Sequence, residues 1–233
     1  MSKTIAIVQS NYIPWKGYFD LINMTDEFVF LDDVQYTRRD WRNRNKIKTP
    51  QGLQWLSIPV DVKGKFHQKV CEVQVQEPSW ARQHWGIIAR AYEKSTFFQR
   101  YCTQVEQWYV GAGELQGLSQ INYWFVSRIC DVLGITTKLS WSNDYETDDE
   151  RSRRLLSICQ QAGATRYLSG PAAKGYLDEE LLNAEGIEVE WMDYSDYPSY
   201  PQLHGEFEHS VSVLDLIYNV GEDVPRFMKS FVG

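Results

Sequence analysis

The feature that most constrains this chain is the alternation of short apolar segments with amphipathic helical segments near both of its ends. At the first end, residues 4–8 form a short β-branched run that is typical of a buried strand. Pro14 suits the first turn of a helix over residues 15–23, and residues 27–31 indicate a second strand. Strands that alternate with helices are typical of a parallel sheet covered by helices. We therefore predict an α/β fold with a mainly parallel sheet and flanking helices.

A long helical section interrupts this alternation. Trp80, His84, Ile88 and Tyr92 share one face at helical spacing, and the helical style continues to Leu133. The remaining segments are strands predicted at 55–60, 136–141, 167–168 and 187–191, helices at 150–162, 176–184 and 211–218, and a loop or hairpin at 37–50. We predict a single α/β domain over residues 1–233, with the helical section at about 77–133 between strand–helix parts at 1–76 and 134–233.

Composition narrows the class of protein. With 233 residues, 43% of them hydrophobic, the chain can bury a full core without disulfides or metals. Its longest apolar runs are too short to cross a bilayer, and the first residues contain no apolar signal region. Four cysteines occur without CxxC or zinc-ligand spacing. We expect a cytoplasmic protein with reduced thiols and without a metal site or a membrane partner.

The charge is distributed unevenly. The net charge is −7, yet residues 36–48 contain six basic side chains and one acidic one. Residues 178–209 contain ten acidic side chains and no Lys or Arg. A local basic site in an acidic protein suits a small anionic ligand better than a long nucleic acid, which the acidic regions would repel. The alternative is that the basic segment is a solvated loop.

The first strand–loop–helix segment is a candidate anion site. Its loop contains Asn11 and Tyr12, and the helix start contains Lys16 and Gly17. A helix that begins at the end of a strand directs free N–H groups toward the sheet edge, where phosphate binds well. Lys16 would add a cation, and Gly17 would allow a close backbone approach. The alternative is a structural turn with apolar side chains in the core.

Two carboxylates follow the second predicted strand. Asp32 and Asp33 are adjacent to each other and precede the basic segment. Such carboxylates can hold a cation, orient a ribose or act as a base. In extended backbone their side chains point to opposite faces, so one of them is expected to face a site. The alternative is a pair of turn residues that hydrogen-bond local backbone.

The basic segment suggests a phosphate-binding loop. Arginine binds phosphate through two parallel charge-assisted hydrogen bonds, tryptophan offers a stacking face, and asparagine supplies neutral donors and acceptors. The candidates for binding a nucleotide diphosphate are Arg38, Trp41, Arg42, Asn43 and Arg44.

Two histidines and a lysine complete the candidates. His84 lies on an apolar helix face, where it is either a satisfied core residue or a neutral base beside a pocket. His204 is a loop candidate for the same role. Lys174 follows a glycine turn that could bind an anion or could be an ordinary connection, and the Walker A pattern is absent.

Several of these blocks together resemble a known family. The segments at 9–20, 31–36, 41–45, 55–60, 167–171 and 200–204 resemble the WbqC-like family of bacteria over nearly the whole chain. The resemblance implies a role in O-antigen or lipopolysaccharide synthesis, and a glycine-transferring role has been suggested for members. A second likeness is to nucleotidylyltransferases with the HIGH motif, including pantothenate synthetase. Lys16-Gly17-Tyr18 stands where that motif is expected, so both motif histidines are missing.

These observations lead to one main hypothesis and two alternatives. The main hypothesis is an N-acyltransferase, of the glycine or aminoacyl type, that forms an amide on a nucleotide-linked amino-deoxy sugar. His84, Asp32 or Asp33 would be the base, and Asn11 or Asn43 would stabilise the oxyanion. ATP with magnesium or an acyl-CoA could supply the acyl group, and homo-oligomerisation is left open. The alternatives are an ATP-dependent ligase or nucleotidylyltransferase-like enzyme, and a non-catalytic nucleotide-sugar-binding protein.

Overall fold

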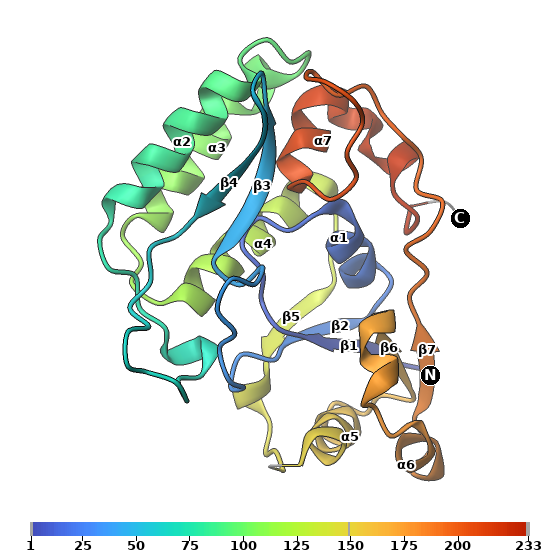
Figure 1. The fold of residues 1–233 in the computed structure, drawn as a ribbon. Helices are drawn as coiled ribbons and strands as arrows, with labels where there is room; N and C mark the ends of the chain where they lie inside the picture. Colours follow the sequence, from blue (N-terminus) through green and yellow to red (C-terminus); the bar gives the residue numbers. More distant parts are fainter. Residues whose placement is uncertain (1, 149, 232–233) are drawn as a thin grey trace.

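A five-stranded parallel sheet organises the molecule. The computed structural model describes residues 2–148 and 150–231 (Figure 1). Each neighbouring pair of strands in the sheet is parallel, in the order β5-β2-β1-β6-β7. The strands are β1 (Thr4–Val8), β2 (Glu27–Phe30), β5 (Lys138–Trp141), β6 (Arg166–Ser169) and β7 (Glu188–Trp191). The predicted α/β fold with a mainly parallel sheet is confirmed.

The strand order is that of a doubly wound sheet. If the five strands are numbered 1 to 5 by their order along the chain, their order across the sheet is 3-2-1-4-5. The direction of winding reverses between β1 and β6. Many unrelated functions share this architecture, so the proposed likeness to HIGH-motif nucleotidylyltransferases is not confirmed by it.

Helices cover both faces of the sheet. Because strand side chains alternate, Ala6 and Phe28 pack with α1 (Lys16–Asn23) and α4 (Leu118–Leu133) on one face. Ile5, Ile7 and Val29 pack on the other face. The helices there are α5 (Arg151–Gln161) and α6 (Glu179–Ala184), which lie below the sheet in Figure 1.

The segment between β2 and β5 forms an outer layer. It contains an antiparallel hairpin, β3 (Arg44–Thr49) and β4 (Gly52–Ser57), and the helices α2 (Ser79–Tyr92) and α3 (Phe98–Ala112) before α4. The strand predicted at 55–60 is therefore displaced: it begins at Gly52, because Gly52 pairs with Thr49 across a tight turn. Short 3-10 turns, η1 (Val70–Glu72) and η2 (Ser142–Asp144), lie in the connections.

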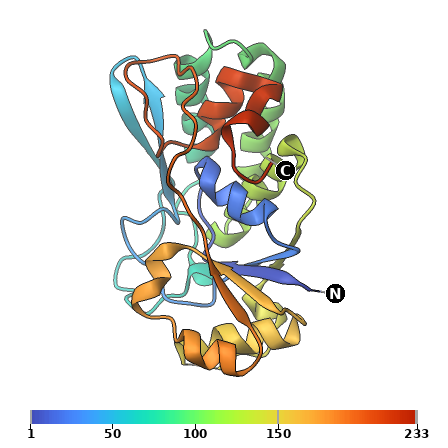
Figure 2. The same ribbon diagram turned by 90° about the vertical axis from the view of Figure 1, so that its right-hand side faces the viewer.

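The last part of the chain runs back across the molecule. Residues 192–212, termed the strap, lead from β7 past α1 to α7 (Val213–Val220), as Figure 2 shows, and η4 (Gly221–Phe227) follows. The helix predicted at 176–184 begins only at Glu179. The preceding residues form the 3-10 turn η3 (Pro171–Gly175), and the Asp178 side chain caps α6 by accepting from the Leu181 N–H. Within the described ranges, every helix is too short or too polar to cross a bilayer.

Candidate functional site

A large cleft opens at the carboxyl ends of the central strands. It has a volume of about 1010 Å³ and is lined by Val8 at the end of β1, Leu31 after β2, and Ser169 at the end of β6. These strands flank the point where the winding direction reverses. In open α/β sheets, this is where ligands bind. We therefore take this cleft as the candidate site.

The lining of the cleft is cationic and aromatic. The basic side chains come from three separate parts of the chain: Arg42, His67 with Lys69, and Arg151 with Arg154. Among the described residues that line it, one is a carboxylate, Asp33. The aromatic lining residues are Trp15, Tyr18, Tyr167, Tyr176 and Tyr194. An excess of positive charge in a protein of net charge −7 favours an anionic ligand at this position.

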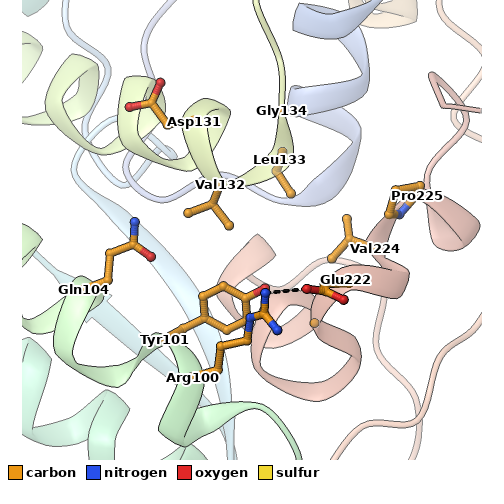
Figure 3. Close-up of a pocket in the computed structure, with 11 residues that line it drawn as sticks. Arg100, Tyr101, Gln104, Asp131, Val132, Leu133, Gly134, Glu222, Val224 and Pro225 are labelled. Carbon is orange, nitrogen blue, oxygen red and sulfur yellow. Dashed lines mark ion pairs between the residues drawn. The ribbon is translucent and has the colours of Figure 1, made fainter.

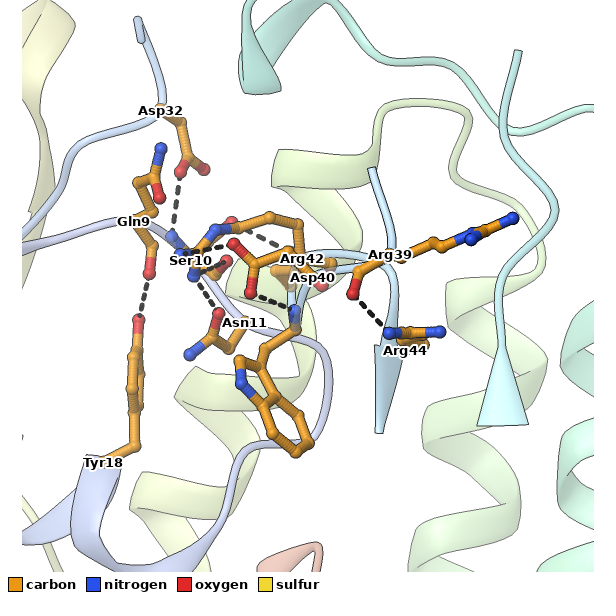
Figure 4. Close-up of polar contacts among 11 residues, drawn as sticks. Gln9, Ser10, Asn11, Tyr18, Asp32, Arg39, Asp40, Arg42 and Arg44 are labelled. Atoms are coloured by element: carbon orange, nitrogen blue, oxygen red, sulfur yellow. Dashed lines mark hydrogen bonds and ion pairs between the residues drawn. The ribbon is translucent and has the colours of Figure 1, made fainter. Parts of the chain in front are cut away.

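Arg42 reaches the cleft from the basic segment and is held by the first loop. Its Nη1 donates to the Asn11 side-chain oxygen and to the Ser10 carbonyl, the latter at 3.5 Å (Figure 4). Its Nη2 lies 3.4 Å from the Asp40 carboxylate. The β1–α1 loop and Arg42 therefore form one unit, although 31 residues separate Asn11 from Arg42.

A buried polar network supports this unit from beneath. The Asp32 carboxylate accepts from the Ser10 backbone N–H at 2.9 Å and from the Ser119 hydroxyl. Asn122, on α4, donates from Nδ2 to the Ser10 hydroxyl and to the Arg42 carbonyl, both at 2.9 Å. Burial raises the pKa of the Asp32 carboxyl. Asp32 and Asn122 thus fix both loops from within the protein.

The two adjacent carboxylates have separate positions. Asp32 is enclosed, whereas Asp33 lines the cleft and accepts from the Ser142 hydroxyl at 2.5 Å. This division is the one expected from alternation of side chains in extended backbone. Asp33 is therefore the carboxylate that a ligand in the cleft would meet.

The start of α1 does not present an open phosphate site. The Trp15 indole folds over Gly17, where an added Cβ would lie 2.3 Å from the ring. Gly17 thus makes room for Trp15, which lines the cleft and contacts Tyr194 with ring centroids 5.2 Å apart. The close approach that Gly17 allows is therefore made by the Trp15 ring of the protein itself.

Lys16 points away from the cleft toward the strap. Its Nζ donates to the Pro198 carbonyl at 3.0 Å and lies 4.8 Å and 5.2 Å from the ring centroids of Tyr197 and Tyr200. Burial lowers the pKa of Lys16 to about 8. The side chain therefore holds the strap against α1.

Tyr12 and His84 form a contact in the core. The Tyr12 hydroxyl lies 2.9 Å from Nδ1 of His84 and 2.7 Å from the Tyr109 hydroxyl. Burial lowers the pKa of His84 to about 4 and raises that of Tyr12 well above its usual value. Neither residue lines the cleft, which matches the core alternative for His84.

The remaining residues of the basic segment diverge. Arg38 donates to the Val62 carbonyl, and Asn43 donates to the Ile58 carbonyl at 2.9 Å. Arg44 and Trp41 both lie against Trp55. The structure therefore brings Arg42 alone of the three candidate loop arginines to the cleft, because the hairpin turns the others outward.

The two late candidates also lie outside the cleft lining. Lys174 stands 5.3 Å from the ring centroid of Trp191, and Nε2 of His204 lies 2.8 Å from the Ala91 carbonyl. The glycine turn that precedes Lys174 does contribute to the cleft, through Gly170 and Pro171. Of the residues selected from the sequence, Asn11, Asp33 and Arg42 line it.

The basic residues that sequence reasoning missed lie after β5 and just before η1. Arg151 and Arg154 lie three residues apart in the first turn of α5, on the same side of the helix, and Lys69 precedes η1. Arg151 also lies 4.5 Å from the ring centroid of Tyr176. Cations are disfavoured at a helix N-terminus by the helix dipole. Their presence there was the signal that could have identified them.

A second cavity has a different character. It measures about 570 Å³ and lies between α3, the end of α4 and η4 (Figure 3). Its arginine, Arg100, is already paired with Glu222. Its lining also contains Asp131 and apolar residues, and no residue of the parallel sheet. We therefore assign the candidate site to the cleft at the sheet edge.

Fold and site together define an α/β protein with a doubly wound parallel sheet and a cationic cleft at its switch point. The chain belongs to the WbqC-like protein family, whose model matches residues 9–227. It is 48% identical over 227 residues to an uncharacterised protein of Mycobacterium tuberculosis. The aligned region covers 97% of this chain and 98% of that protein. No solved structure matches the chain. The family resemblance inferred from the sequence is confirmed.

Proposed function

We propose that the protein binds a nucleotide-linked amino-deoxy sugar in the cleft and transfers an acyl group, of the glycyl or aminoacyl type, to the sugar's amine. Such a reaction would serve O-antigen or other surface-polysaccharide synthesis. The observation that carries the proposal is the convergence of cations from separate segments on an aromatic-walled cleft at the switch point of the sheet.

The cleft suits a ligand with a diphosphate and two ring systems. Arg42 and Arg151 lie on different segments and can hold phosphate oxygens through charge-assisted hydrogen bonds. Trp15 and Tyr194 offer aromatic faces for a base or a sugar. A volume of about 1010 Å³ is at the upper end of the range for small-molecule sites, roughly 300–1,000 Å³, and accommodates a nucleotide sugar.

Amide formation requires a base and an oxyanion donor near the diphosphate site. The amine attacks the acyl carbon, the C–N bond forms, and the leaving group departs with its electron pair. In this proposal Asp33, the carboxylate of the cleft lining, takes the proton from the nitrogen. Asn11 accepts from Arg42 through Oδ1, and within the described chain its Nδ2 forms no hydrogen bond, so it can donate to the oxyanion.

Mass spectrometry can test the reaction directly. The protein would be incubated with amino-sugar nucleotides and glycine, with ATP and magnesium in one series and acyl-CoA in another. We expect a product with the mass of the amide in one of the two series. Asp33→Asn should abolish this product and retain binding of the nucleotide sugar.

Calorimetry tests the binding site separately. Arg42→Ala should weaken the affinity for a nucleotide sugar at least tenfold, about 1.4 kcal/mol. Arg38→Ala is the matched control, since Arg38 lies in the same segment but outside the cleft, and it should leave the affinity unchanged. Unchanged affinity in Arg42→Ala would refute the proposed site. Pyrophosphate release without an amide would favour a nucleotidylyltransferase, and binding without any turnover would favour a binding protein.

A further inference from the structure

A pair of exposed tryptophans lies beside the cleft at the β3–β4 hairpin: Trp55 is in β4, and Trp41 is in the turn just before β3. Trp41 and Trp55 are 37% and 44% exposed, and their ring centroids lie 5.3 Å apart at an angle of 38°. Trp41 directly precedes Arg42, which lines the cleft. We term Trp41, Arg44, Lys46 and Trp55 the hairpin platform.

Two cations accompany the indoles. The Arg44 guanidinium lies 4.2 Å from the Trp55 ring centroid, and Lys46 Nζ lies 5.9 Å from the centroids of both indoles. Lys46 is also the direct cross-strand partner of Trp55. Within residues 2–148 and 150–231, neither cation forms an ion pair with a carboxylate. Their hydrogen-bond partners are neutral: Lys46 Nζ donates to the Ser210 hydroxyl at 3.2 Å and Arg44 Nη2 donates to the Arg39 carbonyl. No carboxylate therefore neutralises either charge by a direct ion pair within these ranges.

The fold does not account for the exposure of these indoles. Most of β4 is exposed, so Trp55 contributes little to the core. Burying a large aromatic side chain is worth roughly 1.5–3 kcal/mol, and adjacent exposed aromatic side chains commonly mark a binding surface. The residues combine flat apolar surfaces with positive charge, which is the chemistry that recognises a sugar ring bearing an acidic group.

We propose that the hairpin platform binds an acidic saccharide. The indoles would contact the C–H face of a sugar ring, and Arg44 and Lys46 would pair with its carboxylate or phosphate group. This inference does not depend on the reaction in the cleft. A long nucleic acid is disfavoured as the occupant, because it would extend from the platform onto the acidic strap, which passes the same hairpin where the Ser212 N–H donates to the Lys46 carbonyl. A short acidic saccharide would contact the platform alone.

Calorimetry with two sugar probes of equal length tests the proposal. Tetragalacturonate is the acidic probe and maltotetraose is the neutral one. We expect the protein to bind tetragalacturonate at least tenfold more tightly than maltotetraose, and more weakly as salt is raised. Trp55→Ala should weaken tetragalacturonate binding at least tenfold, whereas Trp55→Phe, which retains an aromatic plane, should weaken it less. Lys46→Ala should reduce the preference for the acidic probe.

A matched control and a second ligand make the outcome unambiguous. Phe66 is 71% exposed, and the Arg38 guanidinium lies 5.6 Å from its ring centroid. Phe66→Ala therefore removes a similar aromatic–cation pair outside the platform, and it should leave the affinity for tetragalacturonate unchanged. Arg42→Ala should leave tetragalacturonate binding intact even if nucleotide-sugar binding is lost. The proposal is overturned if neither probe binds, or if folded Trp55→Ala, checked by circular dichroism, binds as the parent does. It is also overturned if Trp55→Ala abolishes instead a dimer or the binding of an RNA oligonucleotide.

Discussion

The cleft and the strap contain the same kinds of polar side chain but place them differently. At the strap, Lys48 donates to the Gln202 side chain at 2.8 Å and to the Glu206 carbonyl. Asp215 accepts from the hydroxyls of Tyr92 and Tyr200 at 2.9 Å and 2.8 Å. Lys48 and Asp215 are both buried, and their partners come from the protein itself. The strap therefore uses these groups to hold the fold together.

In the cleft, the charged groups border open volume. Arg42, Lys69 and Arg151 line it together with one carboxylate among the described residues, Asp33. Lys16 illustrates the difference: it follows Trp15, a cleft residue, yet its ammonium serves the strap. Residue type does not distinguish a structural charge from a binding charge. What distinguishes them is whether the surrounding protein encloses the charged group.

The largest loss of stability is expected when α7 loses Asp215, the buried carboxylate that holds the strap residue Tyr200. Asp215→Ala leaves two buried tyrosine hydroxyls without their acceptor, at a cost of about 1–3 kcal/mol each. We expect the free energy of unfolding, measured in urea, to fall by about 3 kcal/mol. Asp223→Ala, at a side chain that is 54% exposed, is the control and should cost little. A loss below 1 kcal/mol for Asp215→Ala would contradict the structural role of this group.

A smaller loss, accompanied by weaker binding, is expected for Asn122→Ala. This change removes the donor that holds the Ser10 hydroxyl and the Arg42 carbonyl. Urea denaturation should show a loss of about 2 kcal/mol, and calorimetry should show weaker nucleotide-sugar binding because both cleft loops are released. Gln120→Ala, on the exposed side of α4, should change neither quantity. Full affinity in Asn122→Ala would mean that the loops hold their positions without it.

Gly17→Ala tests the residue that connects the two regions. The added methyl group would meet the Trp15 ring, so Trp15 has to move although it contacts both the cleft and the strap residue Tyr194. We expect a net loss of about 1–2 kcal/mol in thermal or urea unfolding. Gly86→Ala is the matched helix control: its nearest neighbour is the flexible end of Arg90 at 3.4 Å, and it should stabilise the protein by about 0.5–1 kcal/mol. Stabilisation by both changes would show that Trp15 is not fixed.

The smallest expected effect is a pH dependence from Lys16. Its pKa is lowered from 10.5 to about 8 by burial, so between these values the unfolded chain binds more protons than the folded protein. The stability of the parent protein relative to Lys16→Met should therefore rise with pH, by about 1 kcal/mol between pH 8 and 9.5. The raised pKa values of the buried tyrosines act in the opposite direction only at higher pH. Parallel pH profiles for the two proteins would mean that Lys16 is not desolvated.

Much of the fold follows from local patterns. The predicted strands at 4–8 and 27–31 and the helix at 15–23 appear almost residue for residue, because side-chain periodicity reports which face of an element is buried. The opposite placement of Asp32 and Asp33 follows from the same alternation. The element boundaries that were wrong, at β4 and α6, depend on a tight turn and on a capping carboxylate.

The candidate site was less predictable, because its residues meet only in three dimensions. Asn11 and Asp33 could be expected at the sheet edge, since each follows a central strand. Arg151 and Arg154 were missed although two cations in the first turn of a helix are unusual, because the sequence does not show that this turn faces the cleft. The apolar helix face already offered a core position for His84 as an alternative, but its contact with Tyr12, and that of Tyr12 with Tyr109, was visible only in the fold.

The amino-acid sequence alone determined the parallel α/β architecture and the membership of the family, because periodicity and local motifs are written along the chain. The tertiary structure decided which charged side chains face the cleft. Parallel strands bring segments that are distant in sequence to one edge, and whether a lysine or arginine there meets solvent or a carbonyl depends on what packs beside it. Lys16 is bonded to the strap, whereas Arg42, which Asn11 and Asp40 hold in position, lines the cleft.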